Sequence, residues 1–194
     1  MKKKIVILII ICFIFILIGC NNKNQGEIKF SNLTQKEESL LKLIENEADC
    51  KIYDYVLNNN VKSIYVNFKT LNSNGEWQEN GGASSDISST KGRIAISSFR
   101  DEGNLQISIE NGDGVVKFKS NSELYDNAKG MTRAMAWDEE CNFVCEKEIP
   151  LAMQIISNTS EIGISMNNFY NTDELKDYDI VNAVTVTFSE NTIN

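Results

Sequence analysis

Histidine is absent from this chain of 194 residues, and its absence excludes several kinds of active site. Without an imidazole, neither a Ser-His-Asp nor a Cys-His arrangement can form, and zinc cannot be held through histidine. Paired carboxylates remain as a route to general acid–base catalysis, but 27 acidic residues offer many pairs by chance. No nucleophile motif and no phosphate-binding loop is found. We therefore expect no enzyme, no cofactor and no metal.

Proline is almost as rare, and basic residues do not cluster after the N-terminus. The single proline, Pro150, and only 11 glycines argue against a fibrous or disordered chain. Removing Lys2, Lys3 and Lys4 from the 19 basic residues leaves 16 against 27 acidic ones, a charge near −11. An acidic surface repels phosphate backbones, so we expect no nucleic-acid partner.

The first 20 residues have the three parts of an export signal. Three lysines precede an uncharged apolar run over 5–18, which at about 14 residues is short for a membrane span of about 20. The run ends in Leu17-Ile18-Gly19-Cys20 and is followed by a polar stretch. The length of the run favours a cleaved signal peptide over the alternative, an uncleaved N-terminal membrane anchor. Both interpretations predict that the rest of the chain lies outside the cytosol.

Leu17-Ile18-Gly19-Cys20 resembles the lipobox of bacterial lipoproteins, although Ile18 stands where Ala or Ser is more usual. The resemblance implies a signal peptide over 1–19 and a diacylglycerol group on the Cys20 thiol. The chain would then be attached to the membrane through this lipid anchor, and two or three acyl chains hold a protein on a membrane more firmly than one. The richness in Ile, Asn and Lys resembles low-GC Gram-positive bacteria, which implies the outer face of the cytoplasmic membrane. There the mature domain would bind an envelope partner or serve as a structural part of the envelope.

A polar tether and one helix are predicted next. Residues 21–29 cannot form a core, and we assign 20–33 to the lipidated cysteine and tether and 34–194 to a single domain. Thr34 and Glu37 have the spacing of a capping box. The apolar residues that follow, Leu40, Leu41, Leu43, Ile44 and Ala48, recur at helical spacing. They predict an amphipathic helix over about 35–48 that packs on the domain.

From residue 50 the apolar pattern changes to a period of two, typical of strands. Asn74-Gly75 and Asn111-Gly112-Asp113-Gly114 predict hairpin turns, 81–90 a Gly/Ser-rich loop and 171–178 a short helical turn. Strands are expected near 52–57, 64–68, 76–78, 93–99, 105–109, 115–119, 131–137, 143–149, 151–157, 162–166 and 180–188. Short strands in series after one helix predict a mainly β fold, an antiparallel, jelly-roll-like β-sandwich with an N-terminal amphipathic helix.

Four stretches of this region are similar to segments of short Gram-positive lipoproteins for which no activity is known. They are Asn74-Gly75-Glu76-Trp77, Lys91-Gly92-Arg93-Ile94-Ala95, Glu148-Ile149-Pro150-Leu151 and Ala183-Val184-Thr185-Val186-Thr187-Phe188. The likeness implies a shared envelope location and brings no chemistry with it.

Three cysteines, Cys50, Cys141 and Cys145, remain after the leader and Cys20 are set aside. Outside the cell one disulfide can form among them. On an extended strand the Cα atoms of Cys141 and Cys145 would be about 13 Å apart, beyond bridging distance, unless a turn at 142–144 intervenes. Pairing of Cys50 with either one is equally open, as are buried thiols.

Two further features could bind ligands. Trp77 and Trp137 could stack on cell-wall glycans, although packing in the core is the commoner role of tryptophan. Asp113 and the acidic run 138–140 could hold a cation, but a hairpin turn and a solvated turn explain them as well. The alternatives to a general envelope role are therefore a carbohydrate-binding module and a carboxylate-based hydrolase.

Overall fold

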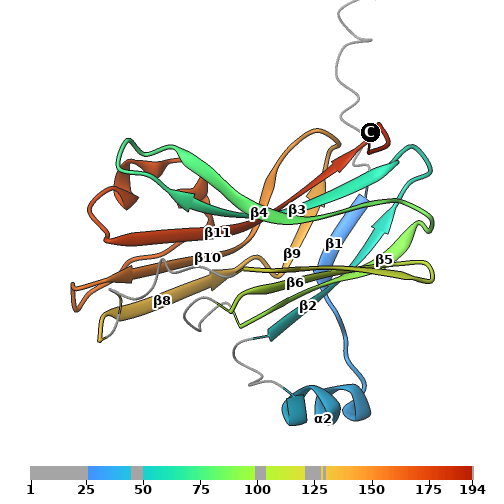
Figure 1. Cartoon of the computed structure of the whole chain (residues 1–194), viewed down its shortest axis with the longest axis horizontal. Helices are drawn as coiled ribbons and strands as arrows, with labels where there is room; N and C mark the ends of the chain where they lie inside the picture. The colour runs from blue at the N-terminus through green and yellow to red at the C-terminus, as the bar shows by residue number, and fades with distance from the viewer. Residues whose placement is uncertain (1–25, 45–49, 99–103, 121–127, 129, 194) are drawn as a thin grey trace, which may run out of the picture.

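The computed structural model describes residues 26–44, 50–98, 104–120, 128 and 130–193, which form two antiparallel sheets (Figure 1). One sheet has six strands in the order β7-β6-β5-β2-β1-β9, and the other has five in the order β4-β3-β11-β10-β8. The expected antiparallel β-sandwich is confirmed. Strands that follow one another in the chain and share a sheet pair antiparallel, and the chain crosses between the sheets after β2, β4, β7, β8 and β9.

The elements have the following bounds. The six-stranded sheet consists of β1 Gly26–Phe30, β2 Cys50–Leu57, β5 Lys91–Ser97, β6 Gln106–Asn111, β7 Gly114–Lys119 and β9 Glu140–Phe143. The five-stranded sheet consists of β3 Ser63–Leu71, β4 Trp77–Asp86, β8 Thr132–Trp137, β10 Ile149–Ser157 and β11 Ile180–Ser189. The helices are α2 Gln35–Ile44 and the short 3₁₀ turns η2 Met166–Phe169 and η3 Thr172–Leu175.

The main core lies between the two sheets. Alternate residues of each strand point inward, so that Tyr53 and Tyr55 of one sheet meet Phe188 and Val66 of the other. The rings of Tyr55 and Phe188 make an edge contact at 5.7 Å, and Phe143 stacks on Phe188 at 4.0 Å. The hydroxyl of Tyr53 donates to the Leu151 carbonyl at 2.8 Å, which ties the two sheets together.

The outer faces of the two sheets differ. The segment that contains η2 and η3 covers the five-stranded sheet, where Phe169 and Leu175 pack with Met153 and Val181. This explains why β10 and β11 are buried on both faces. The outer face of the six-stranded sheet carries charged and polar side chains instead, such as Lys29, Asp54 and Arg93.

The predicted tether is wrong from Gly26 onward, because Gly26–Phe30 is strand β1 at the interior of a sheet. It pairs with β2 on one side and β9 on the other. The alternation of Glu27, Ile28, Lys29 and Phe30 was the signal, since Ile28 is fully buried and the flanking charges point outward. The domain therefore begins before residue 34, and α2 follows the first strand instead of preceding them all.

Three other boundaries differ from the prediction. The Gly/Ser-rich loop over 81–90 is largely the second half of β4, an edge strand where glycine admits the ring of Phe118 from β7 against Gly81. The strand predicted over 143–149 is interrupted after Phe143 by a turn in which Glu146 has φ of 63°, as the chain changes sheets. Residues 162–165 are irregular and lead into η2. The turns at Gly75 and Gly112 and the helical turn at η3 are confirmed, and both glycines have positive φ.

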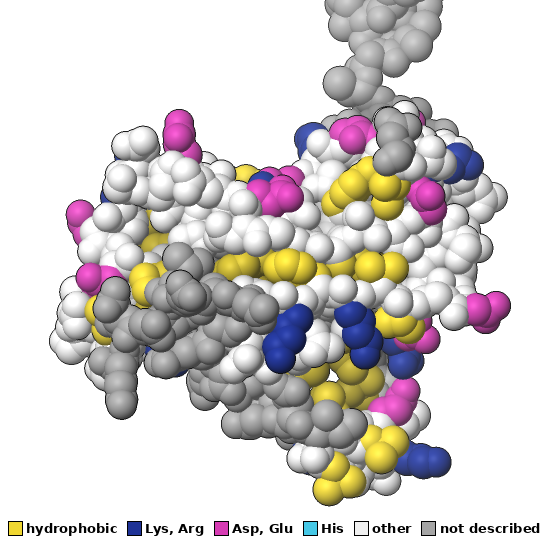
Figure 2. Space-filling model, in the orientation of Figure 1, with side chains coloured by type: hydrophobic (Ala, Val, Ile, Leu, Met, Phe, Trp, Pro, Cys, Tyr) yellow, Lys and Arg dark blue, Asp and Glu magenta, His cyan; other side chains and the backbone are white. Residues whose placement is uncertain are grey.

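Helix α2 begins as predicted but does not pack as predicted. The backbone N–H of Thr34 donates to the Glu37 carboxylate at 2.8 Å and the N–H of Glu37 donates to the Thr34 hydroxyl at 3.3 Å, which is the expected capping box. Leu40 and Leu43, however, are 49% and 80% exposed. Figure 1 shows the helix projecting from one end of the sandwich, and Figure 2 shows hydrophobic side chains at that tip.

Candidate functional site

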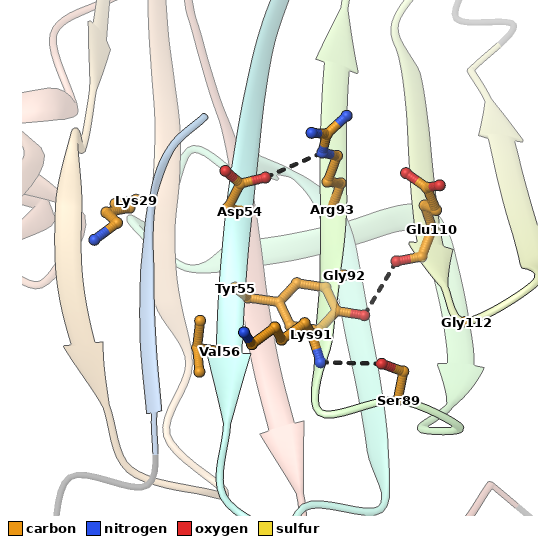
Figure 3. Close-up of a pocket in the computed structure, with 10 residues that line it drawn as sticks. All are labelled: Lys29, Asp54, Tyr55, Val56, Ser89, Lys91, Gly92, Arg93, Glu110 and Gly112. Carbon is orange, nitrogen blue, oxygen red and sulfur yellow. Dashed lines mark hydrogen bonds and ion pairs between the residues drawn. The ribbon is translucent and has the colours of Figure 1, made fainter. Parts of the chain in front are cut away.

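An open hollow of about 450 Å³ lies on the outer face of the six-stranded sheet (Figure 3). Its walls come from four strands, β1, β2, β5 and β6, and from the turns at Ser89 and Gly112. Since Tyr55 points into the core, its neighbours Asp54 and Val56 point outward into the hollow. The same alternation brings Lys91 and Arg93 of β5 to this face.

A row of charges of alternating sign crosses the sheet through this hollow. The register places Glu140, Lys29, Asp54, Arg93 and Glu110 side by side on five successive strands. Opposite charges on directly facing positions stabilise an antiparallel sheet, so part of this row is structural. The Arg93 Nε atom donates to the Asp54 carboxylate at 3.1 Å, and its Nη1 atom reaches Glu37 of α2 at 3.3 Å. Arg93 therefore joins the helix to the sheet.

The floor of the hollow rests on a buried network of hydrogen bonds around Asn111. The Asn111 side-chain nitrogen donates to the Tyr55 hydroxyl and to the Ser89 carbonyl, both at 2.8 Å. Its side-chain oxygen accepts the backbone N–H groups of Ser88 and Ser89. The Tyr55 hydroxyl donates in turn to the Glu110 carbonyl at 3.2 Å. One amide thus holds the turn at Ser88 and Ser89 and, through the Tyr55 hydroxyl, the backbone carbonyl of Glu110.

Glycine at position 92 makes this network possible. A Cβ atom there would collide with the Tyr55 ring and with the Glu110 carbonyl oxygen, both of which lie against the backbone of Gly92. Tyr55 is only 1% exposed, and burial raises the pKa of its hydroxyl, which therefore stays protonated as a donor. The phenol supports the hollow from below and is not a surface for a ligand.

Lys91 and Glu110 are the charged groups of the hollow that remain available to a ligand. Both side chains are exposed, and among the described residues neither the Lys91 ammonium nor the Glu110 carboxylate has an ion pair or a side-chain hydrogen bond. They lie on adjacent strands, and Figure 3 shows that they diverge: Lys91 leans over β2 toward Val56, and Glu110 stays over β6. The hollow thus offers one anion, Glu110, in the row of the Arg93–Asp54 pair and one cation, Lys91, two residues along β5 from Arg93.

The two tryptophans do not lie in this hollow. Trp77 packs on the outer face of the other sheet, where its ring stacks on Phe169 at 5.0 Å and its Nε1–H donates to the Phe169 carbonyl at 3.0 Å. Trp137 packs against the main core. Tyr53 is buried in the core. Trp77 pairs with Leu71 of β3, and Tyr65 lies six residues from Leu71 along that strand, so Tyr65 and Trp77 are about 20 Å apart. The flat aromatic face that a glycan would need is not formed by these residues.

The register separates Cys50 from the other two cysteines. Cys141 and Tyr55 both pair with Ile28 of β1, one on each side of it. Cys50 lies five residues from Tyr55 along β2, which is about 17 Å. Cys145 lies beyond the opposite end of β9, so Cys50 is too far from both for a disulfide. Cys141 is a free thiol in the structure, so the Cys141–Cys145 disulfide that the sequence left open is not formed there. Burial, with Asp138 and Glu140 nearby, raises the pKa of the Cys141 thiol to about 12, and burial raises that of Cys145 to about 11.

Of the two candidate cation sites, the turn at Asp113 has a structural explanation, and Glu140 of the acidic run 138–140 faces Lys29 across the sheet. Gly112 and Asp113 form the two-residue turn between β6 and β7, as expected. No group of three or more Cys, Asp or Glu side chains there is arranged to hold a metal ion. Cys20 and the leader lie outside the described residues. Within the described ranges, no helix has the length and apolar character needed to cross a membrane.

The residues of the hollow were not singled out by the sequence patterns. Lys91 and Glu110 are ordinary outward-facing charges within their own strands, and only the pairing of β5 with β6 brings them together. The one available signal was Lys91-Gly92-Arg93, a glycine between two basic residues inside an alternating strand, which indicates a close approach of another group. It did not reveal that Tyr55 was that group.

Comparisons with known proteins add no assignment. The chain matches no protein-family model, and neither a curated protein nor a solved structure shows a significant match to it.

Proposed function

We propose that this chain is a lipid-anchored protein of the cell envelope whose β-sandwich binds a ligand without catalysis. The anchor would be Cys20, on the outer face of the cytoplasmic membrane. The close spacing of the anchor and the domain supports this: β1 begins at Gly26, so only the short polar stretch 21–25 separates the lipobox-like cysteine from the sheet. Such a spacing suits a domain held at a membrane surface.

The single observation that carries a binding role is the hollow with its two available charges, Lys91 and Glu110. The same hollow argues against hydrolysis. The backbones of Asp54 and Glu110 are two strands apart, about 10 Å, and paired carboxylates on nearby strands are the arrangement that a glycosidase would need. The space between them holds Arg93, whose guanidinium bonds Asp54, and this supports a binding role over hydrolysis. Binding is therefore the better reading.

Acyl labelling tests the anchor. Full-length chain expressed in a Gram-positive host with radiolabelled palmitate should take up the label and partition into the detergent phase. Cys20→Ala should lose the label, whereas Cys12→Ala, a matched cysteine in the predicted leader, should keep it. Label that persists in Cys20→Ala, or wild-type chain that takes up none, contradicts the proposed anchor.

A further inference from the structure

The charges of the hollow limit the chemistry of its ligand. A polyanion would meet the carboxylates of Asp54 and Glu110, and a polycation would meet Lys91 and Arg93, so neither is favoured. A neutral glycan lacks a stacking surface, because the aromatic ring at this site, Tyr55, is buried under the sheet. The face suits a ligand that carries charges of both signs.

We propose that the hollow binds a short zwitterionic peptide, with Lys91 pairing to its carboxylate and Glu110 to its ammonium group. This assignment rests on the binding role proposed above and names the class of ligand. It requires two charges on one small molecule, because both protein charges lie on the same face of adjacent strands.

The spacing of the two charges fits a peptide of about three residues. The register pairs Arg93 with Glu110, so the Lys91 and Glu110 backbones are diagonal neighbours about 7–8 Å apart. Their side chains diverge, which lengthens the span between the ammonium and the carboxylate (Figure 3). An extended tripeptide spans about 10 Å between its ends. A single amino acid is too short to reach both groups.

The support beneath the two charges favours a formed binding surface over a chance arrangement. Ser89, whose hydroxyl accepts the backbone N–H of Lys91, belongs to the turn held by Asn111. The Tyr55 hydroxyl fixes the carbonyl of Glu110. Both backbones are thus positioned by one buried network, and Val56, which is 45% exposed, gives the ligand an apolar contact beside Lys91.

The test uses tri-alanine and its capped forms. Tri-alanine carries both charges, N-acetyl-tri-alanine only the carboxylate, and tri-alanine amide only the ammonium. Titrated into ¹⁵N-labelled full-length chain in detergent micelles, tri-alanine should shift the amide resonances of Lys91 and Glu110 with a Kd on the order of 1 mM. Each capped peptide should bind about twofold to fivefold more weakly, since an exposed ion pair contributes up to about 1 kcal/mol.

Paired variants assign each charge to its partner. In Lys91→Gln, tri-alanine and its amide should bind equally, since the carboxylate no longer has a partner. In Glu110→Gln, tri-alanine and its N-acetyl form should bind equally. Lys91→Arg keeps the charge and should keep binding. Lys119→Gln and Glu161→Gln, matched exposed charges outside the hollow, should leave the Kd unchanged.

Several outcomes would overturn the proposal. Equal binding of capped and uncapped peptides by the unsubstituted chain would remove charge recognition, and unchanged Kd values in both glutamine variants would place the peptide elsewhere. Absence of any shift up to about 20 mM would exclude this ligand class. If the trimer of N-acetylglucosamine shifts the same resonances and tri-alanine does not, the peptide is wrong while the binding role stands. Palmitate labelling of Cys20 is a separate experiment. A negative labelling result would contradict the proposed anchor and would leave the peptide titration unaffected.

Discussion

Replacement of Asn111 by alanine should destabilise the fold by about 3 kcal/mol. The Asn111 side chain accepts from two backbone N–H groups and donates to the Tyr55 hydroxyl and the Ser89 carbonyl. Alanine removes all of these bonds at a residue that is 4% exposed. A hydrogen bond contributes about 1 kcal/mol net, and a buried group left without a partner costs about 1–3 kcal/mol.

The magnitude follows from which groups can regain water. Ser88 is exposed, so its N–H is rehydrated at little cost. Ser89 is half-buried, so water replaces only part of the hydrogen bonding that its backbone loses. The buried Tyr55 hydroxyl loses the donor from Asn111 but still donates to the Glu110 carbonyl. About three of the lost bonds are therefore not replaced, which gives the estimate of about 3 kcal/mol. Ser88→Ala removes only the hydroxyl that donates to the Asn111 side chain at 2.7 Å and leaves the four other bonds in place, so it should cost about 1 kcal/mol.

Urea unfolding of full-length chain in mild detergent, followed by far-UV circular dichroism, measures both variants. The midpoint should fall much further in Asn111→Ala than in Ser88→Ala, with an unchanged dependence on urea concentration. Equal losses in the two variants would refute the reasoning, because they would show that the Asn111 network is already hydrated and does not hold the hollow.

Three other predictions follow from the same contacts. Gly92→Ala should destabilise the chain by about 1–3 kcal/mol in the same urea assay, because the new Cβ collides with Tyr55. The control variant Ala95→Gly, on the same strand, does not touch Tyr55 and should leave the Tyr55 resonances in place. The native Cys141 thiol should react with iodoacetamide at pH 8 roughly 1,000-fold more slowly than in urea, because burial raises its pKa from 9.0 to about 12. Timed peptide mass spectrometry measures both rates, and equal rates would contradict this prediction. The Thr34 backbone N–H is the largest cause of the lowered pKa of Glu37, so the Glu37 carboxylate stabilises the start of α2 above its unfolded pKa and stops doing so as pH falls through its lower folded pKa. The Thr34 amide resonance should therefore shift as the carboxylate is protonated at acid pH. Glu37→Gln should abolish that pH-dependent shift.

The sandwich was predictable because most of its strands carry their own signal. Ile107 and Ile109 alternate with polar residues, and turns at Gly75 and Gly112 have the residues that positive φ requires. β4 was missed because its second half has almost no apolar side chains and is formed by pairing with β3 and by the approach of Phe118. A local pattern contains no information about that contact.

The hollow was unpredictable for a related reason. Each of its charges has the ordinary position of an outward-facing residue, and the site exists only through cross-strand register. The helix shows the opposite error, since a clear apolar stripe predicted packing, yet Leu40 and Leu43 are exposed. Amphipathic spacing indicates which face can be buried and does not say against what.

The register also relates the proposed anchor to the proposed binding surface. Gly26 pairs with Leu57, and the next outward row contains Glu27, Val56 and Lys91, so the hollow begins at the end of β1 nearest Cys20. Six residues of chain span at most about 20 Å. On the proposed anchoring, Lys91 therefore lies within about 25–30 Å of the membrane, while α2 is attached to the far end of β1. On the proposed anchoring, a site so close to the bilayer is more accessible to a short peptide than to a bulky polymer.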